Sequence, residues 1–207
     1  MTSDTETMRN HWWWRPGWSV GRRFYTWHLT FEGQDEVHHL AAEYRAALAS
    51  LGETLTLIPD RWLHLTMQGV GFVGETSEKD VNKIVAAAGE RLAEVPAFDA
   101  EIGPAVIDPE AILLHVHPDT PVRQVRDSVR AAISDVLDEV PERAAGFTPH
   151  VSVAYSAGDG PAAPVATALA GLDLTAARAR ITSAELIVLH RDRQMYEWET
   201  YATVPLG

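Results

Sequence analysis

Two stretches of the chain decide the expected fold: Trp62–Val70, which reads WLHLTMQGV, and Thr148–Tyr155, which reads TPHVSVAY. Both are rich in apolar and β-branched residues, and both predict strands. Because side chains alternate between the two faces of a strand, we expect His64, Thr66 and Gln68 to share one face. The neighbouring leucines and methionine then lie on the opposite, core-facing side.

The second stretch repeats this arrangement. His150, Ser152 and Ala154 are expected to share a face, and Val151 and Val153 are expected to point into a core. Each stretch is therefore predicted to be a strand with one apolar side and one side that carries a histidine followed by a hydroxyl.

The elements before each motif strand suggest an internal duplication. In both cases a strand and a helix precede it, and Tyr25 precedes His64 by 39 positions, as Ala111 precedes His150. A duplicated unit of this kind favours a pseudo-two-fold arrangement in which equivalent strands face each other across a groove. We predict an α+β fold: a two-lobed, pseudo-symmetric module with antiparallel or mixed sheets around a central cleft and helices outside.

Hydrophobic periodicity and turn residues place the remaining elements. Ser77 is expected to cap the second helix, and Asp119 or Thr120 the third. The expected strands cover residues 23–31, 55–58, 62–70, 98–102, 111–117, 148–155, 181–190 and 196–204. The expected helices cover residues 35–51, 77–95, 121–140 and 164–170.

The composition limits the classes of partner. The 207 residues include no cysteine, so disulfides, a thiolate nucleophile and cysteine-ligated metals are excluded. Seventeen Lys and Arg against 29 Asp and Glu give a net charge of −12, which disfavours a long duplex nucleic acid. Any phosphate is therefore expected on a small substrate or an RNA end, held in a local pocket.

The ends of the chain also bear on the domain organisation. Residues 23–207 are expected to form one two-lobed domain, preceded by a Trp-rich arm over residues 1–22. The tryptophans of the arm either pack over the domain or form a stacking surface for bases beside the site. No stretch has the features of a secretory signal, and none reaches the about 20 apolar residues of a membrane span. We therefore expect a cytoplasmic protein. We also expect a monomer.

The paired histidines and hydroxyls indicate phosphate chemistry. A hydroxyl can donate to a phosphate oxygen, and an imidazole can move a proton near neutral pH. Two such surfaces facing each other supply an acid on one side of a phosphorus atom and a base on the other, as in-line phosphoryl transfer requires.

These motifs resemble those of the two-histidine (2H) phosphoesterases, in particular the 2′-5′ RNA ligase-like or LigT-like branch. The matching residues are His64-Leu65-Thr66 and the run from His150 to Tyr155, and the resemblance extends from about residue 23 to the C-terminus. It implies opening of 2′,3′-cyclic or related phosphodiesters without a metal or other cofactor, or, in reverse, ligation of RNA ends. Gln68 stands where the branch often has a basic residue, which would weaken phosphate attraction.

The resemblance implies a catalytic set of His64, Thr66, His150 and Ser152. We expect His150 to take a proton from the attacking water, His64 to protonate the leaving ribose oxygen, and the two hydroxyls to hold the non-bridging oxygens; the histidine roles can be exchanged. Additional substrate-binding candidates are Gln68, His28, Tyr155 and Trp198, although alternation alone directs Tyr155 away from His150.

Alternative sites and functions remain open at this stage. His115 and His117 share a strand face and could hold a metal together with Asp108 or Asp119. His190 and the arginines after it could form a basic lip that contacts phosphate. The same cleft could also belong to a binding module that holds nucleotides or RNA ends without turnover.

Overall fold

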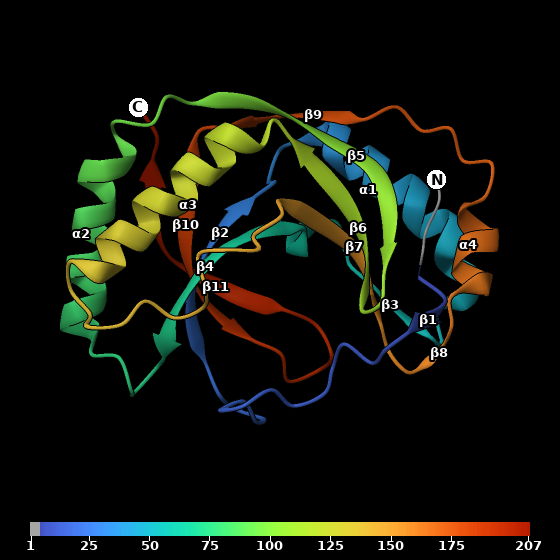
Figure 1. Cartoon of the computed structure of the whole chain (residues 1–207), viewed down its shortest axis with the longest axis horizontal. Helices are drawn as coiled ribbons and strands as arrows, with labels where there is room; N and C mark the ends of the chain where they lie inside the picture. The colour runs from blue at the N-terminus through green and yellow to red at the C-terminus, as the bar shows by residue number, and fades with distance from the viewer. Residues whose placement is uncertain (1–4) are drawn as a thin grey trace.

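Two antiparallel sheets form the framework of the protein in this computed structural model, which describes residues 5–207 (Figure 1). The first sheet has the strand order β11-β10-β2-β4, and the second has the order β3-β7-β6-β5-β9. The first contains β2 (Phe24–Thr30), β4 (His64–Phe72), β10 (Ser183–His190) and β11 (Glu197–Pro205), and the second contains β3 (Leu55–Leu57), β5 (Phe98–Asp108), β6 (Ala111–His117), β7 (His150–Ser156) and β9 (Ala177–Ile181).

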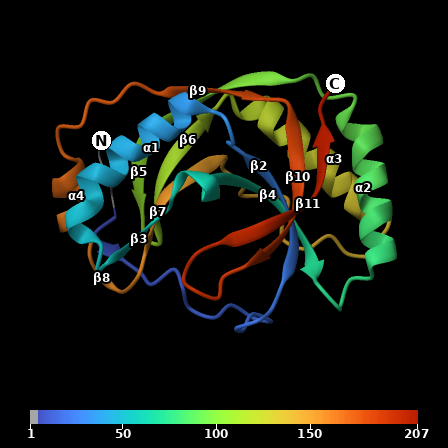
Figure 2. The same ribbon diagram turned by 180° about the vertical axis from the view of Figure 1, so that it is seen from behind.

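The helices cover the outer sides of the two sheets (Figure 2). They are α1 (Asp35–Leu48), α2 (Glu78–Leu92), α3 (Asp119–Ser134) and α4 (Ala163–Leu169). Helix α1 follows β2 of the first sheet, but it packs on β9, β7 and β3 of the second. Helix α3 connects β6 and β7 of the second sheet, but it packs on β4 of the first. This exchange joins the two lobes into one body. No helix among residues 5–207 is long and apolar enough to cross a membrane.

The α+β class and the two-lobed, duplicated arrangement are confirmed. Strand β2 pairs with β4 and β6 pairs with β7, so the two expected strand–helix–strand units are equivalent in the structure. The cap at Ser77 is also confirmed, because its Oγ accepts a hydrogen bond from the Asp80 backbone N–H.

Several predicted boundaries are wrong. Strand β5 ends at Asp108 rather than at Ile102, because its pairing with β6 continues beyond a register shift between Ile102 and Ala105. Helix α3 begins at Asp119 with Pro118 as its N-cap, and it ends at Ser134 rather than at Val140. Asp135 is its C-cap, and carbonyl groups of Arg143 and Ala144 in the following loop accept hydrogen bonds from Arg126 on α3. The strand expected over residues 181–190 is divided at Thr182 into β9 and β10, which belong to different sheets.

A two-stranded ribbon ties the N-terminal arm to the second lobe. Strand β1 (Thr7–Met8) pairs with β8 (Gly160–Pro161), and the His11 backbone N–H donates to the Ser156 carbonyl. Trp12 is buried and its indole N–H donates to Thr56 Oγ1. Residues 7–12 of the arm are thus tied to the domain.

A buried arginine links the two motif strands. Arg126 on α3 donates from Nε to the carbonyl of Met67 in β4, at 2.8 Å. Its two Nη atoms donate to the carbonyls of Ala144 and Arg143, at 2.9 and 3.0 Å, in the loop that leads into β7. Because one guanidinium holds β4 and the approach to β7, we infer that it fixes their relative position.

We expect replacement of Arg126 by methionine to lower the free energy of unfolding by about 2–4 kcal/mol, because three carbonyl groups lose their donor inside the protein. Urea unfolding followed by circular dichroism checks this value. The matched control is Arg123→Met on the same helix, which removes a largely exposed ion pair with Asp119 and should change the value by at most about 1 kcal/mol. Equal small losses in both variants would contradict a linking role for Arg126.

Candidate active site

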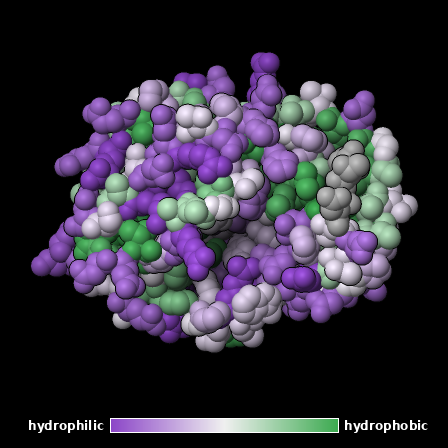
Figure 3. Space-filling view, in the orientation of Figure 1, coloured by the Kyte–Doolittle hydropathy of each residue, from purple (hydrophilic) through white to green (hydrophobic). Residues whose placement is uncertain are grey.

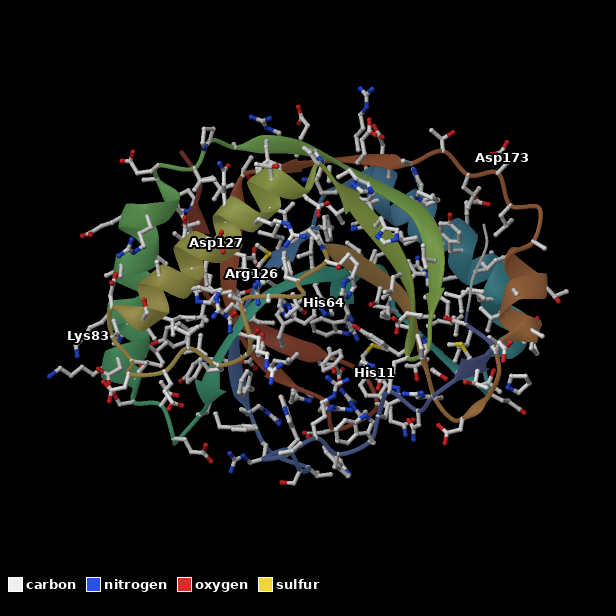
Figure 4. The ribbon with its side chains drawn as sticks, in the orientation of Figure 1. His11, His64, Lys83, Arg126, Asp127 and Asp173 are labelled. Carbon is white, nitrogen blue, oxygen red and sulfur yellow. The ribbon has the colours of Figure 1, made fainter. Side chains whose placement is uncertain are left out.

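A cavity of about 420 Å³ lies between the two sheets. In Figure 3 a hollow opens near the middle of the displayed face, with hydrophilic residues around it, in the region where Figure 4 places His64. The lining comes from both sheets, from the N-terminal arm and from the turn after β10. The polar lining residues include His11, Arg15, Thr26, His28, His64, Thr66, Asp108, Glu110, Glu142, His150, Ser152, Tyr155, Arg191 and Tyr196.

His64 and His150 enter this cavity with the same local geometry. Each begins its strand, and each Nδ1 lies 2.8 Å from the carbonyl oxygen two residues earlier, that of Trp62 or Thr148. A carbonyl can only accept, so Nδ1 carries the proton and donates it. In the neutral imidazole Nε2 then holds the lone pair, which is the form needed to accept a proton.

Thr66 and Ser152 line the same cavity, two residues after each histidine. The structure therefore brings together all four residues of the expected catalytic set. Thr66 Oγ1 lies 3.4 Å from His28 Nε2, and Ser152 shares a hydrogen bond with the phenol of Tyr155.

A β-bulge follows the hydroxyl residue in both motif strands. Met67 is the extra residue in β4, because Trp27 pairs with Gln68 while the next residue, His28, pairs with Thr66. Val153 is the extra residue in β7, where Ile112 pairs with Ala154 and Leu113 with Ser152. Each bulge reverses the alternation of side chains beyond it.

This reversal corrects two expectations. Gln68 does not share the face of His64 and Thr66; it is fully buried outside the cavity, where its Oε1 accepts hydrogen bonds from Arg126 and Arg130. Tyr155, directed away from His150 by simple alternation, lines the cavity instead. Gln68 is therefore out of reach of a ligand in the cavity, whereas Tyr155 can contact one.

The other two candidates lie beside His64. The His28 ring stacks on the His64 ring, with a centroid distance of 4.3 Å and an interplanar angle of 8°, and it lines the cavity. Trp198 meets both rings edge-on, at 5.4 and 5.3 Å, but it lines a neighbouring pocket together with Trp62. Trp198 therefore forms the wall behind His64.

Burial controls the protonation of this histidine cluster. It lowers the pKa of His64 to about 4; the nearby His150 adds to this shift, and the hydrogen bond to the Trp62 carbonyl opposes it. Burial also holds the pKa of His28 well below its usual range. Both imidazoles are therefore neutral at pH 7 in the free protein.

The alternative metal site is not assembled. Within the described part of the chain, no three His, Asp or Glu side chains are grouped closely enough to hold a metal ion. The rings of His115 and His117 lie 6.0 Å apart, and His117 approaches Asp119 at 3.5 Å on the exposed surface. Arg193, one residue of the expected basic lip, is exposed and pairs with Glu197.

Arg191, one residue of the expected basic lip, lines the cavity. Among the polar wall residues that the sequence analysis did not assign to the site are His11 and Arg15 on the arm and Tyr196 near the β10–β11 turn. His11 stacks on Tyr155 with a centroid distance of 4.1 Å, and its Nε2 lies 2.9 Å from the Tyr196 hydroxyl. The signal available in the sequence for the arm residues was polar side chains among the tryptophans.

Several solved structures share this fold at low sequence identity. E. coli LigT complexed with 3′-AMP superimposes with a TM-score of 0.68 at 14% identity, over 90% of this chain and 99% of that one. The protein TT0787 of Thermus thermophilus gives a TM-score of 0.66 at 16% identity, over 89% and 97% of the two chains. A protein of unknown function from Agrobacterium tumefaciens, ATU0111, gives 0.61 at 13% identity, over 86% and 85%.

A search of curated proteins found no match. The sequence model of the 2′-5′ RNA ligase superfamily, in contrast, matches residues 32–193, a span that contains both motif strands and helices α1 to α4. Since this match covers well over half of the chain, the protein belongs to the 2′-5′ RNA ligase superfamily, as its two His-x-Thr/Ser motifs predict.

Proposed function

We propose that the protein is an enzyme that hydrolyses cyclic phosphodiesters, such as the 2′,3′-cyclic phosphate of a nucleotide or an RNA end, and that it acts as a monomer. The observation that carries this proposal is the convergence of His64 and His150 on one cavity, each with Nδ1 tied to a backbone carbonyl and each with a hydroxyl two residues later. The superfamily and the nucleotide complexes of the LigT fold neighbours add support for a small nucleotide as the ligand.

In this proposal, water attacks the cyclic phosphorus while one histidine removes its proton. A new P–O bond forms, the bond from phosphorus to one ribose oxygen breaks, and the other histidine protonates that oxygen. Thr66 and Ser152 donate to the non-bridging oxygens, where negative charge increases. Attack by the hydroxyl of a second RNA end in place of water would give ligation through a 2′-5′ bond.

The pKa of His64 does not decide between the two roles. Because its pKa is about 4, its neutral form is a weak base and its protonated form is a strong but scarce acid at neutral pH. We propose His150 as the base toward water and His64 as the proton donor to the leaving oxygen, and exchanging these roles leaves the same four residues in the site.

We expect His64→Ala and His150→Ala each to lower kcat/KM for adenosine 2′,3′-cyclic phosphate by about 10²–10⁴, the usual contribution of a general acid or base. The matched control is His39→Ala, an exposed histidine on α1, which should keep full activity. Turnover is followed by chromatography, and we expect it to persist with a chelator present. Full activity in either motif variant would exclude the proposal, and tight binding without product would favour the binding module.

The pH profile tests the lowered pKa of His64. Either assignment of the two roles needs one imidazole protonated and the other neutral, and both assignments give the same bell-shaped dependence of kcat/KM on pH. We expect the acid limb of this curve near pH 4, where His64 takes up a proton, so that activity is retained as the pH is lowered from 6 to 4.5. Loss of activity already between pH 6 and 4.5 would contradict this expectation. The His39→Ala variant should reproduce the wild-type curve, and a proton NMR titration of His64 gives its pKa independently.

A further inference from the structure

The N-terminal arm and the β10–β11 turn build a second part of the cavity wall, most of which lies outside the superfamily match. The arm residues His11, Arg15 and Trp18 and the cavity residue Tyr196 are not covered by the matched span of 32–193, whereas Arg191 lies inside it, near its end. The surroundings of Arg191 are therefore built largely by residues beyond the matched span.

Arg191 is a buried cation without a carboxylate partner among residues 5–207. Its residue is 3% exposed, one Nη atom donates to the His11 carbonyl at 3.0 Å, and the other Nη is buried with no hydrogen-bond partner in the same range. Aromatic rings surround the guanidinium, with Trp12, Trp14 and Tyr196 centroids at 5.3, 5.8 and 5.6 Å. Rings stabilise a cation only partly, so a buried donor of this kind is suited to an anionic ligand.

The neighbouring charges do not neutralise Arg191. Glu110, the nearby carboxylate, accepts hydrogen bonds from Arg15 at 2.9 Å and from His11 at 3.2 Å. Burial and the adjacent arginines lower the pKa of His11 to about 3, so it adds no charge at neutral pH. Its Nδ1 therefore donates to Glu110, and its Nε2 accepts the Tyr196 hydroxyl proton.

Tyr196 sets the position of Arg191 relative to the proposed catalytic histidine. The Tyr196 ring centroid is 6.0 Å from the His64 ring centroid and 5.6 Å from Arg191 Cζ. Arg191 and His64 thus both contact the Tyr196 ring, and both line the same cavity. A ligand that reaches both must carry a second anionic group separated from the first.

We propose that Arg191, held by the N-terminal arm, binds a second phosphate on the substrate, on the 5′ side of the nucleoside whose cyclic phosphate is opened. This inference rests on the proposed function for the identity of the first phosphate. The second phosphate has two sources with the same chemistry, a 5′-phosphate on a mononucleotide or the internucleotide phosphate of an RNA end.

The test compares three substrates with the full chain: adenosine 2′,3′-cyclic phosphate, its 5′-phosphorylated form, and the dinucleotide ApA with a 2′,3′-cyclic end and a free 5′-hydroxyl. We expect the wild type to prefer a substrate with a second phosphate by about 10- to 100-fold in kcat/KM, through KM, which is the usual effect of a charged hydrogen bond. Arg191→Met should remove this preference, measured as the ratio of kcat/KM between the substrates, and Arg191→Lys should keep part of it.

Two outcomes would overturn the inference. One is a wild type with no preference, and the other is an Arg191→Met variant that loses the same factor on all three substrates. Dependence of the dinucleotide on Arg191 indicates an RNA end as the source, and dependence of the 5′-phosphorylated mononucleotide alone indicates a nucleotide. Arg193→Gln on the same turn, with an exposed side chain outside the cavity, is the matched control and should behave as wild type.

A binding measurement separates this inference from the proposed function. Calorimetry compares adenosine 2′-monophosphate with adenosine 2′,5′-bisphosphate, and neither ligand requires turnover. Tighter binding of the bisphosphate that disappears in Arg191→Met supports the second phosphate site even if no cyclic phosphate is hydrolysed. Equal affinities in the wild type contradict it even if hydrolysis is found.

Discussion

The site depends on the contact between β4 and β7, two strands that lie side by side although they belong to different sheets and share no ladder of hydrogen bonds. Nothing in the backbone pairing holds them at a fixed spacing. The constraint comes from the helices, because α1 and α3 each pack on the sheet of the other lobe, and from Arg126, which bonds to β4 and to the loop before β7. Chemistry that requires two histidines on opposite sides of one phosphorus needs such an inter-sheet clamp, since one sheet alone cannot present both.

The sequence predicts the elements and the pairing of the motifs well, because both depend on local signals. Periodicity identifies α1 and α2, and the equal spacing of 39 positions identifies the duplicated units. It fails at Gln68 and Tyr155 because a β-bulge is a property of the pairing with a neighbouring strand, and neither Met67 nor Val153 carries a local sign of one. A single extra residue reverses the direction of every side chain after it, so pattern reasoning is reliable for the His-x-Thr/Ser unit and not beyond.

The arm marks a second limit of sequence reasoning. Its contacts span most of the chain: His11 meets Tyr196 across 185 positions and Glu110 across 99. Such contacts have no periodicity to reveal them, and the run of tryptophans suggests only that apolar area is buried. The arm tryptophans do not share one role. Trp12 is buried and packs over the domain, Trp18 lines the cavity, and Trp13 and Trp14 are about half exposed.

The acidity of the chain and an anionic substrate are compatible because they act over different ranges. The net charge of −12 repels a long polyanion at a distance, but salt screens that field within about 8–10 Å under physiological conditions. Inside the cavity the relevant charge is local, and Arg191 is a desolvated cation whose attraction is less screened than that of a surface lysine. The imidazoles of His28 and His64 are neutral at pH 7, so they contribute no charge to the cavity. A terminal phosphate, as the proposed function requires, can therefore meet a buried cation inside the cavity, whereas the body of a nucleic acid meets only the acidic exterior.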